Sequence, residues 1–192
     1  MFKREENAFV LDFLPQGKSG EAKREPVVQL LGDQQFTLLE ATPKPGETLA
    51  LGEQVYIGRG DRDKVTHIRG RIQYSQLTNS AQRELEVQVG HIVLRREPEF
   101  VHFLNKAGSI SIRVHALELL PSIGKKHLQA LLAEREKKPF DNFLDVNARV
   151  HNLSQVDEIF VQRILSELKG DEKYYLFVKM PSREEETRRR RF

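Results

Sequence analysis

The chain contains no cysteine among its 192 residues. This absence excludes disulfide-stapled folds, thiol nucleophiles, iron–sulfur clusters and cysteine-ligated zinc sites. Long hydrophobic runs are also missing, and nothing approaches the roughly 18 apolar residues of a membrane span. The short apolar stretch at residues 8–14 is interrupted by Asp12 and followed by Pro15, which is not the pattern of a secretion signal. We therefore expect a cytoplasmic protein without a membrane segment.

Composition and charge leave a wide choice of partner. Hydrophobic residues make up 39% of the chain and charged residues 31%, enough apolar side chain for a folded core. The net charge of +3 lies in residues 107–192, because residues 1–106 carry equal numbers of basic and acidic side chains. The overall charge is thus weak support for a nucleic-acid partner, and local clusters must decide between that and an ordinary solvated surface.

The first part of the chain has the pattern of short strands separated by turns. The β-prone segments are residues 8–14, 27–31, 36–41, 54–57 and 65–74. This spacing predicts a small closed or half-closed barrel. In the last segment Val65, His67, Arg69 and Arg71 alternate with the other side chains, which predicts a strand with one wet, basic face.

Helical spacing begins after residues 78–80, a cluster of N-cap residues in which Asn79 lies at capping-box distance from Gln82. Apolar residues then recur every three or four positions, which predicts two helices broken near Pro98 that pack on the barrel or lead away from it. The alternation of Leu85, Val87 and Val89 leaves a strand open as an alternative.

From Ile110 onward the pattern predicts short helices. One stripe consists of Ile110, Val114, Leu117 and Leu120; further helices are predicted before Pro139, from Asn142 to about Val150, and from the Ser154/Asp157 capping pair to Gly170. Residues 173–178 are predicted to be extended, and the charged residues 182–192 to be disordered. The predicted domains are a barrel (1–77), linker helices (78–107), a helical domain (108–181) and a tail (182–192).

Residues 119–128 read Leu-Leu-Pro-Ser-Ile-Gly-Lys-Lys-His-Leu. This segment resembles the helix-hairpin-helix motif, whose usual turn is Pro-Gly-(Ile/Val)-Gly. A second helix that begins here would present unpaired N–H groups, and lysines in its first turn oppose the helix dipole unless an anion binds. The candidate phosphate contacts are Ser122, Ile123, Gly124, Lys125, Lys126 and His127, with Ser122 in place of the first glycine. An ordinary pair of antiparallel helices remains the alternative.

A second basic cluster lies on the predicted barrel. It consists of Arg59, Arg62, Lys64, Arg69 and Arg71, with Tyr56 and Tyr74 nearby. Barrels of the oligonucleotide/oligosaccharide-binding (OB) type hold single strands with cations and stacked aromatic rings. A charged hairpin with internal Arg–Asp pairing would explain the same residues.

Nearly the whole chain resembles an uncharacterised archaeal family of predicted nucleic-acid-binding proteins. The residues that carry the resemblance are 10–17, 36–40, 43–46, 55–60 and the hairpin at 119–128. The resemblance implies an OB-like barrel followed by a helix-hairpin-helix domain, and a nucleic acid as ligand. It implies no particular activity.

We therefore expect a nucleic-acid-binding protein, with RNA slightly favoured over DNA by analogy with archaeal OB-like domains. A protein-interaction scaffold is the alternative. Helix-hairpin-helix glycosylases place a catalytic aspartate near the positions of Asp141 and Asp145, but helix capping explains both residues, and we expect no enzyme. The six histidines lack metal-ligand spacing, so neither a metal nor a cofactor is predicted.

Overall fold

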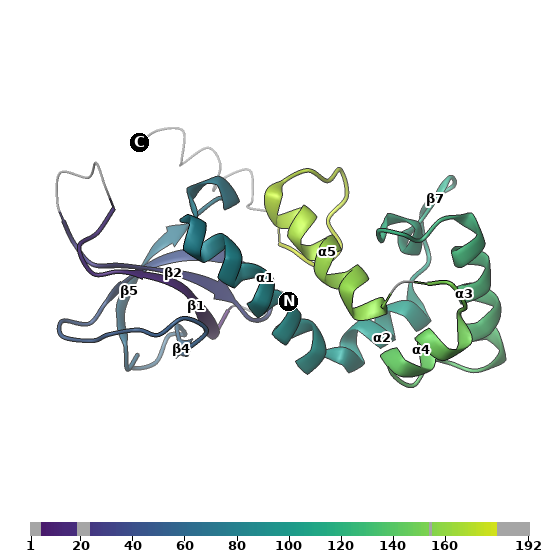
Figure 1. Ribbon diagram of the computed structural model, residues 1–192, viewed down its shortest axis with the longest axis horizontal. Coiled ribbons are helices and arrows are strands. Elements are labelled where there is room, and N and C mark those ends of the chain that lie inside the picture. The colour runs from purple at the N-terminus through teal and green to yellow at the C-terminus, as the bar shows by residue number, and fades with distance from the viewer. Residues whose placement is uncertain (1–4, 19–23, 154, 180–192) are drawn as a thin grey trace.

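Five antiparallel strands form the N-terminal half of the protein. In the computed structural model, which describes residues 5–18, 24–153 and 155–179, they are β1 (Asn7–Leu14), β2 (Val27–Gly32), β3 (Leu38–Pro43), β4 (Gln54–Tyr56) and β5 (Val65–Arg71). The strand order is β4-β1-β2-β3-β5, and the sheet curls into a half-barrel (Figure 1). The predicted half-closed barrel of five strands is confirmed.

Both faces of the sheet are covered, as the burial of every residue of β2 shows. One face closes over a small core inside the curl, which includes Val10, Leu30 and Val65. The opposite face belongs to the main core of the protein, to which Leu11 and Leu31 contribute. Strict alternation along β1 is interrupted by an irregularity between Val10 and Asp12.

Helix α1 (Asn79–Arg95) covers the outer face of the sheet and packs against both β1 and α5 (Val156–Lys169). Its N-cap is Thr78, whose Oγ1 accepts the N–H of Ala81 at 3.0 Å and donates to Oδ2 of Asp12 at 2.6 Å. The cap therefore also fixes the helix to β1. A helix rather than a strand occupies this region, as the three- and four-residue spacing predicts.

The second predicted helix is α2 (Glu97–Lys106), which continues away from the sheet after a break at Arg96. Pro98 occupies one of its first two positions, where a missing N–H removes no helical hydrogen bond. Together, α1 and α2 confirm the two helices separated near Pro98.

The helix predicted through Ile110 and Val114 is wrong. The chain instead forms a small hairpin of β6 (Ser109–Ser111) and β7 (Val114–His115), and only then a four-residue 3₁₀ turn, η2 (Ala116–Leu119). The stripe failed because β-branched residues at 110, 112 and 114 also fit the two-residue period of a strand. What precedes the candidate hairpin turn is thus a single 3₁₀ turn rather than an α-helix.

The remaining helices are α3 (Lys125–Lys137), α4 (Phe143–Arg149) and α5. Asn142 caps α4 through its side chain, as predicted, and Gly170 ends α5 in the left-handed conformation with φ of 85°. The predicted Ser154 cap lies outside the described residues, as does the tail. The predicted extended segment at 173–178 forms no strand, because Glu167 binds its N–H groups in place of a neighbouring strand.

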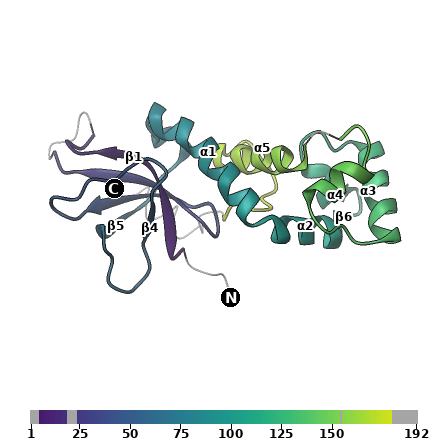
Figure 2. The ribbon, with the colours of Figure 1, turned by 60° about the horizontal axis from the view of Figure 1, so that its bottom comes forward.

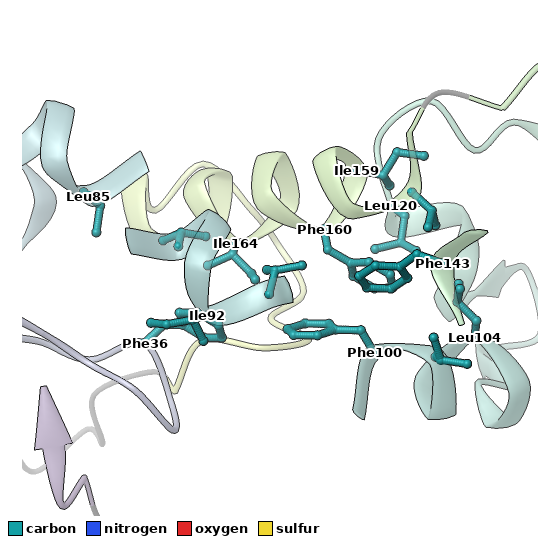
Figure 3. Packing of buried hydrophobic residues seen from close by; sticks show 14 of the residues in the cluster. Phe36, Leu85, Ile92, Phe100, Leu104, Leu120, Phe143, Ile159, Phe160 and Ile164 are labelled. Atoms are coloured by element: carbon teal, nitrogen blue, oxygen red, sulfur yellow. The ribbon is translucent and has the colours of Figure 1, made fainter. Parts of the chain in front are cut away.

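One hydrophobic core runs from the sheet into the helical half. Figure 3 shows this continuity from Phe36, after β2, through Ile92 of α1 and Phe100 of α2 to Phe160 of α5. The ring centroids of Phe100 and Phe160 lie 4.8 Å apart. The predicted linker helices therefore contribute core residues, and the sheet and the α3/α4 region lie at opposite ends of an elongated molecule (Figures 1 and 2).

Candidate nucleic-acid interface

The turn between η2 and α3 is built on an unusual backbone conformation. Ser122 has φ of 63°, in the left-handed region that costs an L-residue about 1–2 kcal/mol. The next side chain, Ile123, is only 5% exposed and belongs to the main core. The turn is therefore anchored by an apolar plug, and Ser122, which stands where the resemblance predicts a glycine, adopts the left-handed conformation.

Helix α3 begins directly after this turn, with Gly124 as its N-cap. Gly124 supplies no side-chain cap, the first turn contains no acidic residue, and a Cβ at this position would meet nothing within 4 Å. Lys125 and Lys126 are exposed and form no hydrogen bond or ion pair with the described residues. The start of α3 thus presents open backbone N–H groups beside two unpaired ammonium groups.

His127 ties the turn to the helix. Its Nδ1 lies 2.9 Å from the carbonyl oxygen of Ser122. Because a carbonyl oxygen only accepts, Nδ1 carries the proton in this hydrogen bond. In the neutral ring Nε2 is then an acceptor, so His127 can donate to a phosphate through Nε2 only when the ring is protonated.

The basic cluster on the sheet is more occupied by its own surroundings. Arg62, in the loop between β4 and β5, donates from Nε to the carbonyl of Gly58 at 2.9 Å and from Nη1 to that of Thr66 at 3.2 Å. Lys64 pairs with Glu53, and this hydrogen bond lowers the pKa of the Glu53 carboxyl and keeps the pair charged. Both side chains hold their loop in place.

The remaining cations of the cluster differ in exposure and in their partners. Arg69 donates from Nε to Thr42 Oγ1 at 2.9 Å and from Nη2 to the carbonyl of Pro26 at 3.2 Å. Arg71 faces Leu39 in the strand register and is half-buried. Arg59 alone in the cluster is exposed and lacks a hydrogen bond or ion pair with the described residues.

The predicted single basic face of β5 is wrong. Two irregularities in the pairing with β3 shift the register, so Val65 is buried while Ile68 packs against the same core. The strand also ends at Arg71, and Tyr74 begins a 3₁₀ turn, η1 (Tyr74–Gln76). Sequence alternation could not show the irregularities because each one moves the following side chains to the other face.

The two tyrosines near the cluster are not open platforms. The loop folds over the ring of Tyr56: a Cβ on Gly58 would collide with its hydroxyl group, and the N–H of Gly60 donates to that hydroxyl at 3.3 Å. Tyr74 is half-buried, with Nζ of Lys169 5.6 Å from its ring centroid. Lys169 is thus a cation close to Tyr74, and the sequence spacing did not predict that it lies near the barrel.

The structure does not bring the two predicted clusters together. The sheet cluster and the start of α3 belong to the two ends of the molecule seen in Figures 1 and 2. Between them lies a cavity that the sequence did not predict, at the junction of the β2–β3 turn, α2 and residues 176–177. The three chain segments that form its walls are at least 60 positions apart, beyond the reach of any periodicity.

Asp141 and Asp145 have local partners. Asp145 Oδ2 accepts the N–H of Asp141 at 3.1 Å and a hydrogen bond from Arg149 at 2.9 Å, and the backbone bond contributes most to a lowered pKa of Asp145. Asp141 pairs with Lys138 at 2.6 Å. These contacts stabilise the start of α4.

The described residues lack the features of two other kinds of site. Within residues 5–18, 24–153 and 155–179, no three histidine, aspartate or glutamate side chains converge to hold a metal ion. In the same part of the chain, no helix has the length and apolar character needed to cross a membrane.

The family described as "Protein of unknown function (DUF655)" matches residues 4–179. The chain is similar to Uncharacterized protein MJ0038 of Methanocaldococcus jannaschii, with 46% identity over 179 residues that span 92% of this chain and 81% of that protein. It is also similar to the crystal structure of Af1531 from Archaeoglobus fulgidus, with a TM-score of 0.84, 40% identity, and coverage of 91% of this chain and 100% of that one. Sequence and fold thus agree with the predicted archaeal resemblance, and the chain belongs to the DUF655 family.

Proposed function

We propose that this protein binds nucleic acid through phosphate contacts and performs no chemistry on it. The observation that carries the proposal is the start of α3, where Gly124 leaves the helix without a side-chain cap and Lys125 and Lys126 have no partner among the described residues. Cations in the first turn of a helix oppose its dipole, whereas a bound phosphate would satisfy both the N–H groups and the lysines.

The turn before α3 supports the same interpretation. The left-handed Ser122 and the buried Ile123 have the features that the helix-hairpin-helix motif requires of its turn, although η2 is shorter than the first helix of that motif. In this interpretation, the exposed backbone at Gly124 is the part of the turn that approaches a phosphate.

The half-barrel would supply a second contact. A five-stranded, partly open antiparallel barrel is the architecture of OB-folds, which hold oligonucleotides on their strands and loops. Arg59 is the exposed cation of the basic cluster, and Arg62, Lys64, Arg69 and Arg71 set its local charge and geometry. RNA is favoured over DNA by analogy alone.

Salt-dependent binding tests the proposal. Labelled single- and double-stranded RNA and DNA should bind, with affinity that falls linearly as log salt rises. The double substitution Lys125→Glu/Lys126→Glu should weaken all ligands alike and reduce the salt slope by about two units. A matched control, Lys137→Glu/Lys138→Glu, makes the same charge change at the other end of α3 and should have a much smaller effect. Equal losses in both variants would contradict a specific role for the start of α3.

A protein-interaction scaffold remains the second candidate, because large apolar side chains are exposed in the helical half. Ile112, between β6 and β7, is fully exposed, and Leu144 on α4 is 78% exposed. Apolar groups on a surface are typical of protein contacts when they cluster. A complete lack of salt-linked nucleic-acid binding by the full chain would favour this alternative.

A further inference from the structure

The β6–β7 hairpin carries apolar side chains into the solvent at the helical end of the molecule (Figure 1). Ile112, between the two strands, has a relative exposure of 105%, and Ile110 is 41% exposed. Every residue from 108 to 113 is exposed. Because the side chain of Ile112 is removed from no water, it adds no hydrophobic stabilisation to the fold. The folding of the chain therefore gives no reason for an isoleucine at the tip.

The base of the hairpin is fixed to the helices. The carbonyl oxygen of Gly108 accepts the N–H of Ala116 at 2.9 Å, which closes the hairpin. Arg135 of α3 donates from Nη1 to the carbonyl oxygens of Leu104 and Ala107, each at 2.9 Å, and so holds the chain just before the hairpin. Turn η2 contacts both β7 and α3. The tip is thus mounted on the helix whose first turn is proposed to bind phosphate.

The surroundings of the tip are basic. Residues 105–126 contain four lysines or arginines and a single acidic residue, Glu118. Glu118 is already engaged, since its Oε2 accepts the N–H of His115 at 2.9 Å. The side chains of Lys106 and Arg113 are exposed and form no hydrogen bond or ion pair with the described residues. This charge favours a polyanion over the mixed-charge surface of a typical protein partner.

An exposed isoleucine among unpaired cations matches the chemistry of a wedge between bases. Proteins that bend or open nucleic acids insert Phe, Leu, Ile, Met or Pro side chains between base steps. Cations beside the wedge hold the neighbouring phosphates. Resting on the proposed nucleic-acid binding, we propose that Ile112 enters between stacked bases of a base-paired nucleic acid whose backbone is held by Arg113 and the start of α3.

A wedge gives the protein a selectivity that phosphate contacts do not provide. Phosphates repeat identically along a duplex, whereas the free energy needed to open a base step is least where a base is mismatched. The protein would therefore favour duplexes with a weakened stack. Ser109 and Ser111 flank Ile110 with small side chains, so they leave room for a groove to approach the tip. The minor groove of an RNA duplex is wide and shallow, and that of DNA is narrow, so both duplexes are compared in the test.

The test uses the full chain with short RNA and DNA duplexes, either fully paired or with one central mismatch beside a 2-aminopurine, whose fluorescence rises when it is unstacked. We expect a mismatched duplex to bind about tenfold more tightly than its paired counterpart, and its fluorescence to rise further at saturating protein. Ile112→Ser should abolish both effects. It should leave the salt slope and the urea midpoint unchanged, because Ile112 is neutral and buries no surface.

The matched control is Leu144→Ser, which replaces another exposed apolar side chain of the helical half, 78% exposed on α4. It should keep both the mismatch preference and the fluorescence change. A response with RNA only, or with DNA only, would support the wedge and identify the duplex that it enters.

Equal affinity for paired and mismatched duplexes, or a preference that survives in Ile112→Ser, would overturn the inference. The proposed function would stand in that case if binding still falls with salt. Absence of binding to any duplex or single strand would refute both. A dimer in analytical ultracentrifugation that dissociates in Ile112→Ser would also overturn the wedge, because it would assign the tip to a contact between two copies of the chain.

Discussion

Nη1 of Arg163 donates a hydrogen bond of 2.7 Å to the carbonyl oxygen of Leu119. Arg163 lies in α5 and Leu119 ends η2, so this bond joins the last helix to the segment just before the candidate phosphate-binding turn. The guanidinium group is only 3% exposed and is balanced by Glu167, whose carboxylate lies 2.9 Å from Nε. The position of the turn thus depends on a buried charged pair more than 40 residues away.

Arg163→Ala is expected to lower the free energy of unfolding by about 3–5 kcal/mol, because it leaves the buried Glu167 without its partner. Urea denaturation followed by circular dichroism measures the loss. The double variant Arg163→Met/Glu167→Gln removes both charges but keeps an acceptor for only one of the N–H groups of Leu176 and Phe177, which bind different carboxylate oxygens. Because it leaves no buried charge unpaired, it should still cost less than the single change. A larger loss in the double variant would contradict this account.

Ser122→Gly should raise the free energy of unfolding by about 0.5–1 kcal/mol. Glycine adopts φ of 63° without the steric cost that serine bears, although its more flexible unfolded chain offsets part of the gain. Ser122→Ala is the control, since alanine keeps the Cβ and should not stabilise the fold. Equal stability of the glycine and alanine variants in urea would show that the left-handed turn carries no strain.

The stability should depend on pH through His115. Burial lowers the pKa of His115 below 6.5, and the positive charge of Arg135 acts in the same direction, opposed by Glu118. Between the folded pKa and 6.5 the unfolded chain binds the proton first, so stability falls as pH decreases through this range. Protonation would also break the hydrogen bond from the N–H of Leu117 to Nδ1 of His115.

His115→Asn should therefore reduce the slope of unfolding free energy against pH in the range just below pH 6.5. Denaturation curves at several pH values measure both slopes. The two proteins differ only at this position, so the difference between the slopes isolates His115, and identical slopes would refute its contribution.

Arg59 and Arg62 should respond differently to substitution by serine. Arg59→Ser removes an exposed cation and should weaken single-strand binding with a change in unfolding free energy within about 0.5 kcal/mol. Arg62→Ser leaves the carbonyl groups of Gly58 and Thr66 without their donor and should also destabilise the loop. Arg83→Ser on α1 is the control for a general charge effect. A stability loss in Arg59→Ser as large as in Arg62→Ser would contradict these different roles of the two arginines.

The sequence was sufficient for elements whose signals are local. The five strands could be predicted from β-prone segments separated by turn residues, and α4 starts where Asn142 can cap it. The β6–β7 hairpin was missed because Ile110, Ile112 and Val114 also fit the two-residue period of a strand, and the strands form although Ile110 and Ile112 are exposed. The irregularities of β5 were missed because they arise in the pairing with β3.

In the candidate site, too, local features could be predicted and contacts between distant segments could not. The turn at Ser122, Ile123 and Gly124 was found because its residues are consecutive and each has a distinct backbone role. The roles of Arg62 and Arg69 as internal donors depend on carbonyl groups of other segments, and no spacing reveals them. The cavity at Arg96 and Phe177 requires the folded junction itself.

The helix α1 also works as a rigid spacer. Its 17 residues span about 25 Å, and they pack against β1 of the half-barrel and against α5 of the helical half, so they fix the distance between the two. A strand with the duplex rise of about 3.4 Å per nucleotide would need seven or eight nucleotides to cover that length alone. Affinity would therefore depend on the length of the ligand. Shorter oligonucleotides would contact one end of the protein, and only longer ones would gain the avidity of both ends. Affinity plotted against oligonucleotide length should thus rise in a step rather than smoothly.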